Sequence, residues 1–353
     1  MLCLDAPDGE RLVSGGMDGS VRLWDLSAGR AARALLLDGS EVNCVCLGRS
    51  GEANNFVWAA AGAEVCGFDL RAPGMVLREP VVRLCANREE IGHLALNPSG
   101  MVLAAADDSG DVQLFDLDAG RQLAALEDAH DSLCSCVAFN PGRDWELCTG
   151  GMDTQCKEWD FRRTLLIQSW SLAPPPERTS GQLLNPRHVH CLSYAPGGGV
   201  IAIALGDGSI ELRQSGTGEV ITVAEAHRAA TSQAYFAPQL ATSLTGAVPL
   251  ISAGDDRQLR LWMARGLRPT ASGAASAKRH RGVGTGEALG VDEDDDEMSY
   301  EAPALQPIAS LNLEEKPNWI APVSLAGSGT GAVCIASNAE GIMVLPVNQG
   351  AFV

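Results

Sequence analysis

The residues of this 353-residue chain that could do chemistry are cysteines and histidines paired at short spacings. C-x-C and H-x-H pairs occur in zinc sites, where thiolates and imidazoles bind the ion. The candidate ligands are Cys44, Cys46, Cys134, Cys136, His188, His190 and Cys191. Four residues (Cys44, His93, Cys136 and Cys191) fall at equivalent places in separate strand-like runs, where cysteine behaves as a small hydrophobic residue. We therefore interpret the set as core residues and predict no metal site and no cofactor.

No catalytic motif supports an enzyme. The sequence contains no nucleophile elbow, phosphate-binding loop, HExxH helix or pair of carboxylates in a supporting context. The glycine-rich stretches at 15–19 and 205–209 lie between two alternating runs, so they indicate hairpin turns, whereas a phosphate loop would open a helix. We predict no catalytic residue. An enzyme or small-ligand sensor that uses a central channel is the third-ranked hypothesis.

Charge and cysteine usage bound the partners and the compartment. The net charge of −18 has the wrong sign for gripping phosphate backbones or anionic lipid. There is no uninterrupted apolar run of about 18 residues and no signal-peptide pattern at the start. The 11 scattered cysteines fit a reducing compartment without disulfides. We expect a soluble, intracellular protein, cytoplasmic or nuclear or both, with no direct nucleic-acid or membrane partner.

A repeat organises the chain. Each unit has an apolar alternating run, a Gly/Asp-rich tight turn, a second alternating run ending in an aromatic residue and Asp, and a third apolar run. Copies lie at residues 12–25, 103–116, 147–160, 201–213 and 250–262, with weaker copies at 56–71 and 332–347. Their aromatic-Asp pairs recur near the spacing of about 40–45 residues that is typical of WD repeats. The chain thus resembles the WD-repeat family over nearly its whole length, which implies an all-β fold, a seven-bladed WD40 β-propeller.

The resemblance also assigns a hydrogen-bond network to the blades. In this family a His before the blade, a Ser or Thr on its second strand, an Asp in the tight turn and a Trp on its third strand bond to one another. A buried polar group left unpaired costs about 1–3 kcal/mol, so a missing member is destabilising. Two blades hold complete sets, and the first blade lacks only the His: His130, Thr149, Asp153 and Trp159; His227, Ser252, Asp256 and Trp262; and Ser14, Asp18 and Trp24.

Closure of the ring is left open between three alternatives. Propellers usually close when the N-terminus supplies the outer strand of the last blade, but here the innermost strand of the first blade follows Met1 at once. Either the C-terminal residues 350–353 contribute, or the last blade stays incomplete with three strands, or the sequence begins later than the native protein.

Two stretches interrupt the repeat. Residues 173–188 join two blades on the top face, where the loops between blades gather. The domain organisation we predict is blades one to six over residues 1–265, a disordered low-complexity insert over 266–306, and completion of blade six plus blade seven over 307–353, with 308–313 as the missing outer strand. Within the insert, we interpret the basic cluster 278–281 as a solvated loop rather than a nuclear-import signal. We interpret the acidic run 292–297 as solubilising rather than as binding a basic partner.

The segment 147–162 resembles the box shared by WD proteins that dock on damaged-DNA-binding protein 1, the adaptor of cullin 4 ubiquitin ligases. Most of the box serves the blade, but Arg162 falls where the third strand leaves the sheet, on the bottom rim. There its guanidinium could fork onto a partner, held by Asp160 two residues earlier. Asp69 and Arg71 repeat this geometry two blades before, so both arginines should emerge on the same face and Arg71 is a second candidate adaptor-binding residue. The alternative is that Arg71 and Arg162 are ordinary rim arginines without a docking role.

The chain as a whole is similar to the WD repeat-containing protein 53 family, through the stretches 102–121, 136–141, 180–190 and 316–320. That resemblance implies a substrate receptor of the cullin 4 ligase, with the adaptor on the bottom rim and an unknown substrate on the top face or at the channel mouth. The short N-terminus and the thin basic cluster depart from the family. The alternative is a generic scaffold of an unrelated complex, in which the top-face loops or the acidic insert hold the partner.

Overall fold

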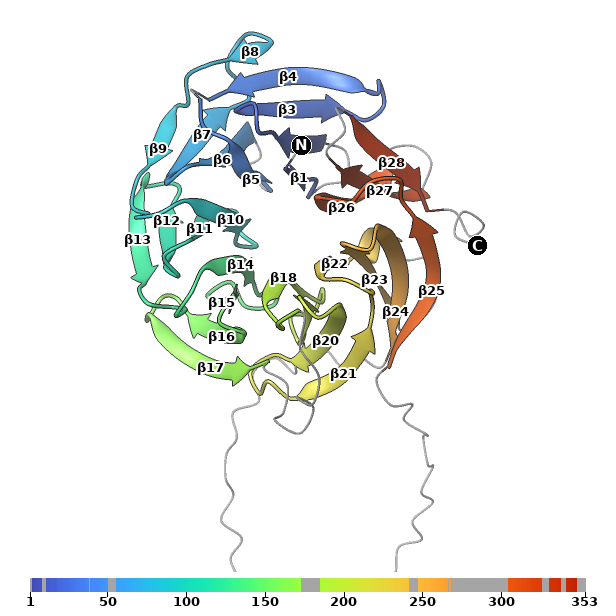
Figure 1. Ribbon diagram of the computed structural model, residues 1–353. Coiled ribbons are helices and arrows are strands. Elements are labelled where there is room, and N and C mark those ends of the chain that lie inside the picture. The colour runs from blue at the N-terminus through green and yellow to red at the C-terminus, as the bar shows by residue number, and fades with distance from the viewer. Residues whose placement is uncertain are drawn as a thin grey trace, which may run out of the picture.

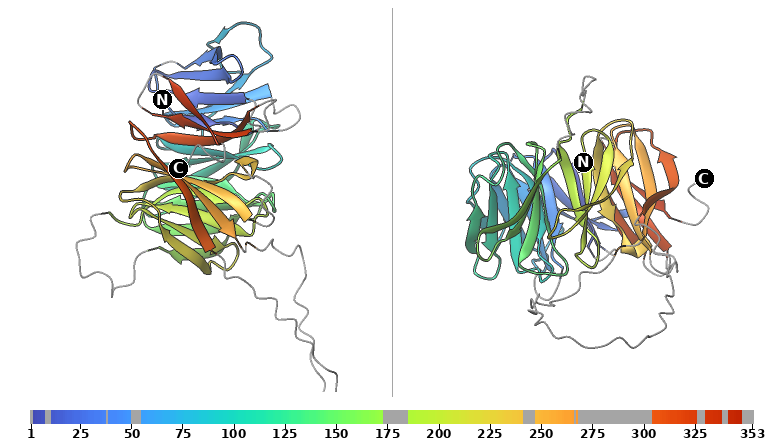
Figure 2. Two further views of the ribbon diagram at one scale, coloured as in Figure 1. Left: turned by 90° about the vertical axis from the view of Figure 1, so that its right-hand side faces the viewer. Right: turned by 90° about the horizontal axis from the view of Figure 1, so that it is seen from below.

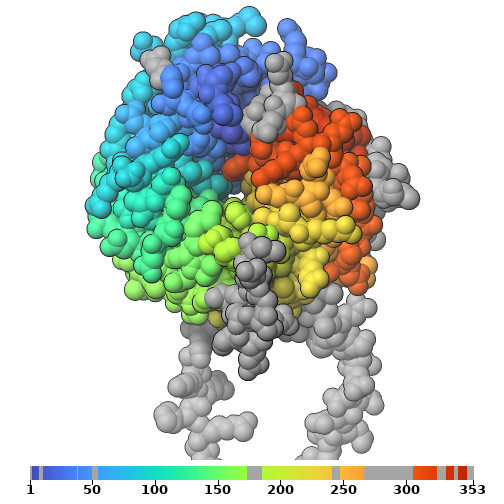
Figure 3. Space-filling model, in the orientation of Figure 1, coloured from blue at the N-terminus to red at the C-terminus, as the bar shows by residue number. Residues whose placement is uncertain are grey.

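The computed structural model describes residues 2–7, 11–37, 39–49, 55–172, 185–240, 247–265, 267, 304–325, 330–337 and 341–347. Within these ranges the chain forms seven sheets, arranged as blades around one axis, in which all strand pairs but one are antiparallel (Figure 1). The space-filling view shows successive blades in contact around the ring, with the last blade beside the first (Figure 3). The predicted all-β, seven-bladed propeller is confirmed.

The blades follow the chain in order, and the innermost strand of each comes first. Blades one and two contain β1 (Cys3–Asp5), β2 (Arg11–Gly15), β3 (Ser20–Asp25), β4 (Arg30–Leu36) and β8 (Val76–Leu77), then β5 (Val42–Leu47), β6 (Phe56–Ala61), β7 (Glu64–Asp69) and β9 (Val82–Leu84). Blades three and four contain β10 (Ile91–Leu96), β11 (Val102–Asp107), β12 (Val112–Asp116) and β13 (Arg121–Leu126), then β14 (Cys134–Phe139), β15 (Glu146–Gly151), β16 (Gln155–Asp160) and β17 (Leu165–Ser171).

The later blades repeat this order. Blades five and six contain β18 (Val189–Tyr194), β19 (Val200–Leu205), β20 (Ser209–Gln214) and β21 (Val220–Glu225), then β22 (Thr231–Phe236), β23 (Ala247–Gly254), β24 (Gln258–Arg265) and β25 (Ala304–Asn312). Blade seven contains β26 (Trp319–Leu325), β27 (Thr330–Ala336) and β28 (Ile342–Pro346). A 3-10 turn, η3 (Pro238–Leu240), follows β22.

Burial falls from the middle of each sheet outward. The second strands of blades four and five are wholly buried, because each is flanked by strands within its sheet and by a blade on either side. The outer strand β17 instead exposes most of its side chains. Apolar clusters join neighbouring blades, so the stabilising contact is face-to-face packing around the ring.

The tight turn between second and third strands needs a left-handed residue. In blade five this residue is Gly208, with φ +90°, and a Cβ there would lie 2.3 Å from the carbonyl oxygen of His227. Gly110 occupies the same place in blade three, with an equally close approach to the His130 carbonyl. Glycine is therefore required in these two blades, since a side chain would meet the carbonyl of the entry loop of the next blade. Blades four and six have Thr154 and Arg257 at this position, both with φ +62°.

The first and last sheets depart from the predicted four strands. Blade one gains β8, a two-residue strand from the loop of blade two, which pairs in parallel with β4 through Ala34 and Leu35. Blade seven has three strands in the described part of the chain. It meets blade one through apolar side chains, among them Leu4 and Leu12 against Val323.

Two of the predicted segments bear on the inserts. The predicted outer strand 308–313 is found as part of β25, which begins at Ala304 and so takes three residues from the expected insert 266–306. Residues 268–303, with the basic cluster and the acidic run, lie outside the described residues. So do 173–184, most of the predicted top-face loop, and 350–353.

Each four-stranded blade presents one pair of connections to each face of the ring, which is seen edge-on in Figure 2. We call bottom the face that carries the connections from first to second and from third to fourth strand. In blade four these are residues 140–145 and 161–164, which lie together because Glu146 pairs with Asp160. The rim arginines follow third strands and therefore lie on this bottom face.

Candidate protein-interaction site on the rim of blade four

Blade four contains the complete predicted network. The indole Nε1 of Trp159 donates to Thr149 Oγ1 at 3.0 Å, and His130 Nε2 lies 2.8 Å from the same hydroxyl. His130 Nδ1 lies 3.0 Å from Asp153 Oδ1. Burial lowers the pKa of His130 although Asp153 opposes the shift, so the imidazole is neutral near pH 7. A neutral ring that donates from Nδ1 and accepts at Nε2 satisfies every member.

Blade six repeats this geometry. Trp262 Nε1 donates to Ser252 Oγ at 2.9 Å, and His227 Nε2 lies 2.8 Å from that hydroxyl. His227 Nδ1 lies 2.9 Å from Asp256 Oδ1, and burial lowers the pKa of His227 as well. The two complete sets found in the sequence therefore share one arrangement.

Blade one contains the shorter set. Trp24 Nε1 donates to Ser14 Oγ at 2.9 Å, but Asp18 accepts from the Ser20 side chain at 2.6 Å and from Arg22 at 2.9 Å. The hydrogen bond from Ser20 lowers the pKa of Asp18. In the absence of a histidine, the turn aspartate thus serves its own turn and the adjacent strand.

Blade five carries a substitute network that the sequence pattern did not reveal. Arg187, two residues before β18, pairs with the turn aspartate that binds His in blades four and six, with Nε 2.9 Å from Asp207 and Nη2 3.0 Å from Glu211. Arg213 takes the place of the Trp and pairs with Glu211 at 2.6 Å, while its guanidinium lies 5.8 Å from the Trp170 ring centroid. The available signal was the Arg in the run ending at 213, where the other strong repeats have an aromatic residue.

The corner after β16 shapes the rim of blade four. Phe161 is buried and packs edge-on against Phe139, with ring centroids 5.6 Å apart. Asp160 Oδ1 accepts the backbone N–H of Arg162 at 3.1 Å, which closes a local turn. Phe161 N–H also donates to the Trp145 carbonyl at 3.1 Å. The corner is thus fixed below by the core and beside by the neighbouring loop.

Asp160 does not hold the guanidinium of Arg162, contrary to the expectation. Its second oxygen lies 3.8 Å from Nε of Arg163. The Arg162 guanidinium instead lies over the ring of Trp145, 5.4 Å from the centroid. Trp145, Asp160, Arg162 and Arg163 together line a shallow hollow at this edge of the blade. The physical reason is that the neighbouring loop places the Trp145 ring at the rim, where it offers the guanidinium a cation–π partner.

The corner of blade two binds its arginine differently. Arg71 Nε lies 3.0 and 3.1 Å from the two carboxylate oxygens of Asp69, and Nη2 lies 2.9 Å from Oδ2. The hydrogen bonds from Arg71 lower the pKa of Asp69. The preceding residue is tied to blade one, because Arg33 Nη1 donates to the Leu70 carbonyl. Here the predicted Asp-x-Arg pair does form, and it neutralises its own guanidinium.

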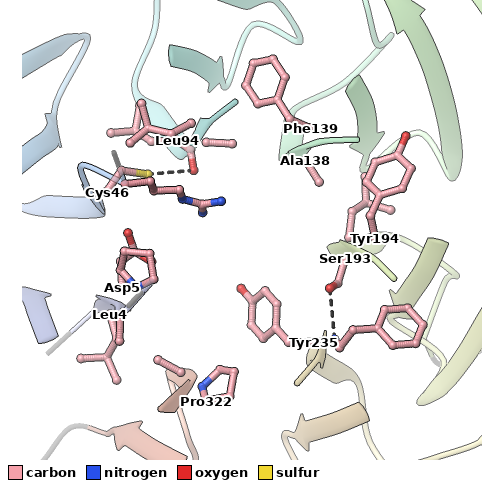
Figure 4. Close-up of a pocket in the computed structure, with 18 of the residues that line it drawn as sticks. Leu4, Asp5, Cys46, Leu94, Ala138, Phe139, Ser193, Tyr194, Tyr235 and Pro322 are labelled. Atoms are coloured by element: carbon pink, nitrogen blue, oxygen red, sulfur yellow. Dashed lines mark hydrogen bonds between the residues drawn. The ribbon is translucent and has the colours of Figure 1, made fainter. Parts of the chain in front are cut away.

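The central channel contains a cavity of about 500 Å³, lined by the inner strands (Figure 4). Tyr235 points into it, and His93 stacks on Trp319 with centroids 5.8 Å apart. Burial lowers the pKa of His93 to about 4. Cys44, Cys136 and Cys191 occupy the same register as His93 on other blades, so the predicted equivalence of these four positions is confirmed.

No cluster of three potential metal ligands occurs among the residues that the structure describes. The 11 cysteines are free thiols, ten of them buried. Within the described ranges, none of the helical segments has the length and apolar character needed to span a bilayer.

The comparisons with known proteins agree with this geometry. The sequence matches the family "WD domain, G-beta repeat" over residues 2–25 and 120–160, the second stretch ending at Asp160, two residues before Arg162. The chain folds as a seven-bladed β-propeller, and its sequence is similar to WD repeats over these two stretches. It is 25% identical over 281 residues to "WD repeat-containing protein 53 homolog" of Dictyostelium discoideum, with 74% of each chain covered.

Two solved structures share the fold at low sequence identity. The WD40 β-propeller domain of Doa1 superposes with a TM-score of 0.67 at 15% identity, covering 100% of this chain and 94% of that one. A chain of the mitotic checkpoint complex gives a TM-score of 0.70 at 16% identity, covering 98% of this chain and 87% of the other. These likenesses concern the fold alone.

Proposed function

We propose that this WD-repeat protein is a non-catalytic substrate receptor that docks on damaged-DNA-binding protein 1, the adaptor of cullin 4 ubiquitin ligases, through the bottom rim of blade four. The fold supports the coarser half of the proposal, because WD-repeat propellers serve as scaffolds for protein partners. The finer half is supported by the box at 147–162 and by the arrangement of Arg162.

One observation carries the proposal: within the described residues, the Arg162 guanidinium has no carboxylate or carbonyl partner. It lies at the rim, above an exposed aromatic ring, at the end of a corner fixed by hydrogen bonds. Such a group is available to fork onto the carboxylates or carbonyls of another protein, and charge-assisted contacts of this kind are among the stronger ones in interfaces.

The two faces of the ring suit a receptor. The adaptor would occupy the bottom rim, and the substrate would bind at the top face or the mouth of the channel. Because the blades form a rigid ring, a substrate held on one face keeps a fixed orientation to an adaptor held on the other. We propose an intracellular site of action, in the cytoplasm, the nucleus or both, and no direct contact with nucleic acid or membrane.

The test is calorimetric titration of the purified adaptor into the whole chain and its Arg162→Ala variant. Loss of a forked contact at an interface hot spot can weaken affinity by about 2 kcal/mol, roughly thirtyfold. Stability should stay within about 0.5 kcal/mol of wild type, because the side chain is on the surface. Arg71→Ala is the matched control, since it removes a rim arginine that is already paired with Asp69.

The outcomes separate the two candidate functions. A weakened Arg162→Ala variant with an unchanged melting temperature supports the receptor. Equal adaptor affinity for wild type and a well-folded Arg162→Ala variant contradicts it. A generic scaffold that binds partners elsewhere on the propeller then becomes the preferred function.

A further inference from the structure

Trp145 is the exposed tryptophan of this chain. All seven tryptophans lie in the described ranges, and the other six are buried or half-buried, whereas Trp145 keeps 39% of its surface accessible. Tryptophan is enriched at protein interfaces, because its large ring supplies apolar contact area and its indole N–H a polar contact. Its place on the bottom rim is therefore informative.

The exposure of Trp145 is not the result of a loose loop. Asn140 accepts the N–H of Gly142 at 2.9 Å, and its own side chain donates to the Gly198 carbonyl of blade five at 3.2 Å. Arg143 pairs with Glu146 at 2.8 Å. The loop 140–145 is thus closed by hydrogen bonds at both ends, and it presents the indole from a defined position.

The same loop fixes the corner that carries Arg162. The Trp145 carbonyl accepts the N–H of Phe161, and the Trp145 ring lies beneath the Arg162 guanidinium at 5.4 Å. An arginine side chain has many rotamers in water, and binding must select one of them. A ring that already favours one position by a cation–π contact reduces what is lost on binding.

The hollow lined by Trp145, Asp160, Arg162 and Arg163 has a definite chemical preference. It contains two guanidinium groups and one carboxylate, and that carboxylate is near Arg163 at 3.8 Å. The remaining charge is positive and lies against an apolar indole. A carboxylate side chain next to an apolar one fits this combination, in a chain whose net charge is otherwise −18.

We infer that Trp145 is a positioning residue for Arg162, that the two act as one unit in docking, and that the partner presents a carboxylate beside an apolar side chain to this hollow. The inference rests on the proposed function and extends it, because neither the box at 147–162 nor any comparison assigns a role to Trp145.

The experiment is a double-mutant cycle of adaptor affinity with the whole chain, using Arg162→Ala, Trp145→Leu and the double variant. Trp145→Leu keeps an apolar side chain but removes the aromatic face, so we expect affinity to fall about fivefold to tenfold. In the Arg162→Ala background the same change should cost about twofold or less. Trp145→Phe, which restores an aromatic face, should recover affinity to within about twofold of wild type.

Contrary outcomes are distinct. If Arg162→Ala lowers affinity and Trp145→Leu does not, the receptor stands and this inference fails. If Trp145→Leu weakens binding by the same factor in both backgrounds, the ring is an independent contact and the positioning role is refuted. If Arg162→Ala itself has no effect, both the receptor and this inference fall together.

Two further measurements test whether the effect is specific to the Trp145 side chain. Leu133, 40% exposed and located on the opposite face before β14, should be replaceable by Ala without change in affinity. The difference in fluorescence between wild type and Trp145→Phe reports on Trp145. Acrylamide quenching of this component should fall when the adaptor is bound, because the indole becomes covered. Unchanged quenching in the saturated complex would show that Trp145 lies outside the interface.

Discussion

The third strands of blades two and four both end in an Asp-x-Arg corner, but different interactions hold the two strands in place. In blade four the third strand ends in Trp159, opposite Leu147 and bonded to Thr149. In blade two the equivalent residue is Phe68, opposite Val57, and Ala59 stands where Thr149 would be. A hydrogen-bonded network supports one corner and an apolar core supports the other.

The interactions that support each strand do not determine where the arginine side chain of the corner lies. Both aspartates accept the backbone N–H two residues later, at 3.1 Å in blade four and 2.8 Å in blade two. Only Asp69 also holds the guanidinium that follows it. The turn thus sets the backbone of the corner, while the surroundings of the side chain decide whether the cation is neutralised or presented. A sequence motif alone does not distinguish these states.

The largest expected effect is the loss of stability when the hydrogen-bond network of blade four is disrupted. Trp159→Ala removes a buried aromatic ring and leaves Thr149 without its donor, so we expect a loss of about 3–5 kcal/mol in the free energy of unfolding. Phe68→Ala should cost a similar amount through cavity formation alone. Urea denaturation of both variants checks this, and a Trp159→Ala variant as stable as wild type would show that the network contributes nothing to blade four.

A smaller effect isolates the hydrogen bonds from the packing. Thr149→Val keeps the shape of the side chain but removes the hydroxyl shared by Trp159 and His130, so a loss of about 1–3 kcal/mol is expected. Ser14→Ala in blade one, where no histidine takes part, should cost less. Equal losses at the two sites, measured by the same denaturation, would indicate that the histidine adds nothing.

Protonation offers a reversible version of this test. Burial depresses the pKa of folded His130 below its ordinary value, so the unfolded chain binds the proton more readily. Stability is then fully present above about pH 6.5 and decreases as the pH falls toward the folded pKa. At pH 5 the effect is at most about 2 kcal/mol for one histidine, since pH 5 lies about 1.5 units below 6.5. Denaturation at pH 7.5 and pH 5 should differ less in His130→Gln than in wild type.

The smallest effect concerns the rim of blade two. Arg71 is paired with Asp69 and half exposed, so Arg71→Ala should change stability by no more than about 0.5 kcal/mol. It should also weaken adaptor binding by less than about threefold, well below Arg162→Ala. Calorimetry on the two variants side by side checks this order, and a larger effect for Arg71 would move the docking site to blade two.

The fold was predictable because each blade repeats its own signal. The tight turn and the aromatic-Asp ending recur, and even the outer strand of blade six was located across a long insert, within β25. Strand β8 was not predictable. Its two residues lie in a stretch with Pro73, Gly74 and Pro80 that has no alternation, and its pairing with β4 depends on a neighbouring blade.

For the candidate site, the sequence predicted where the residues lie but not which contacts their side chains make. Sequence reasoning located Asp160 and Arg162 on the rim but paired their side chains, because the Trp145 ring that lies beside Arg162 comes from another connection of the blade. Sequence reasoning did not identify Trp145, because a single aromatic residue in a polar loop is not part of any repeated pattern. The contact between loop 140–145 and the corner joins two connections that only the folded sheet brings together.

The parallel strand β8 has a consequence for the order in which the chain can fold during synthesis. The outer edge of blade one is complete only after Val76 and Leu77 have left the ribosome, by which time the first three strands of blade two are also present. Until then β4 is an uncovered edge that could pair with another chain. The first two blades should therefore mature as one unit, and a ribosome paused before residue 76 would expose a nascent chain prone to aggregation.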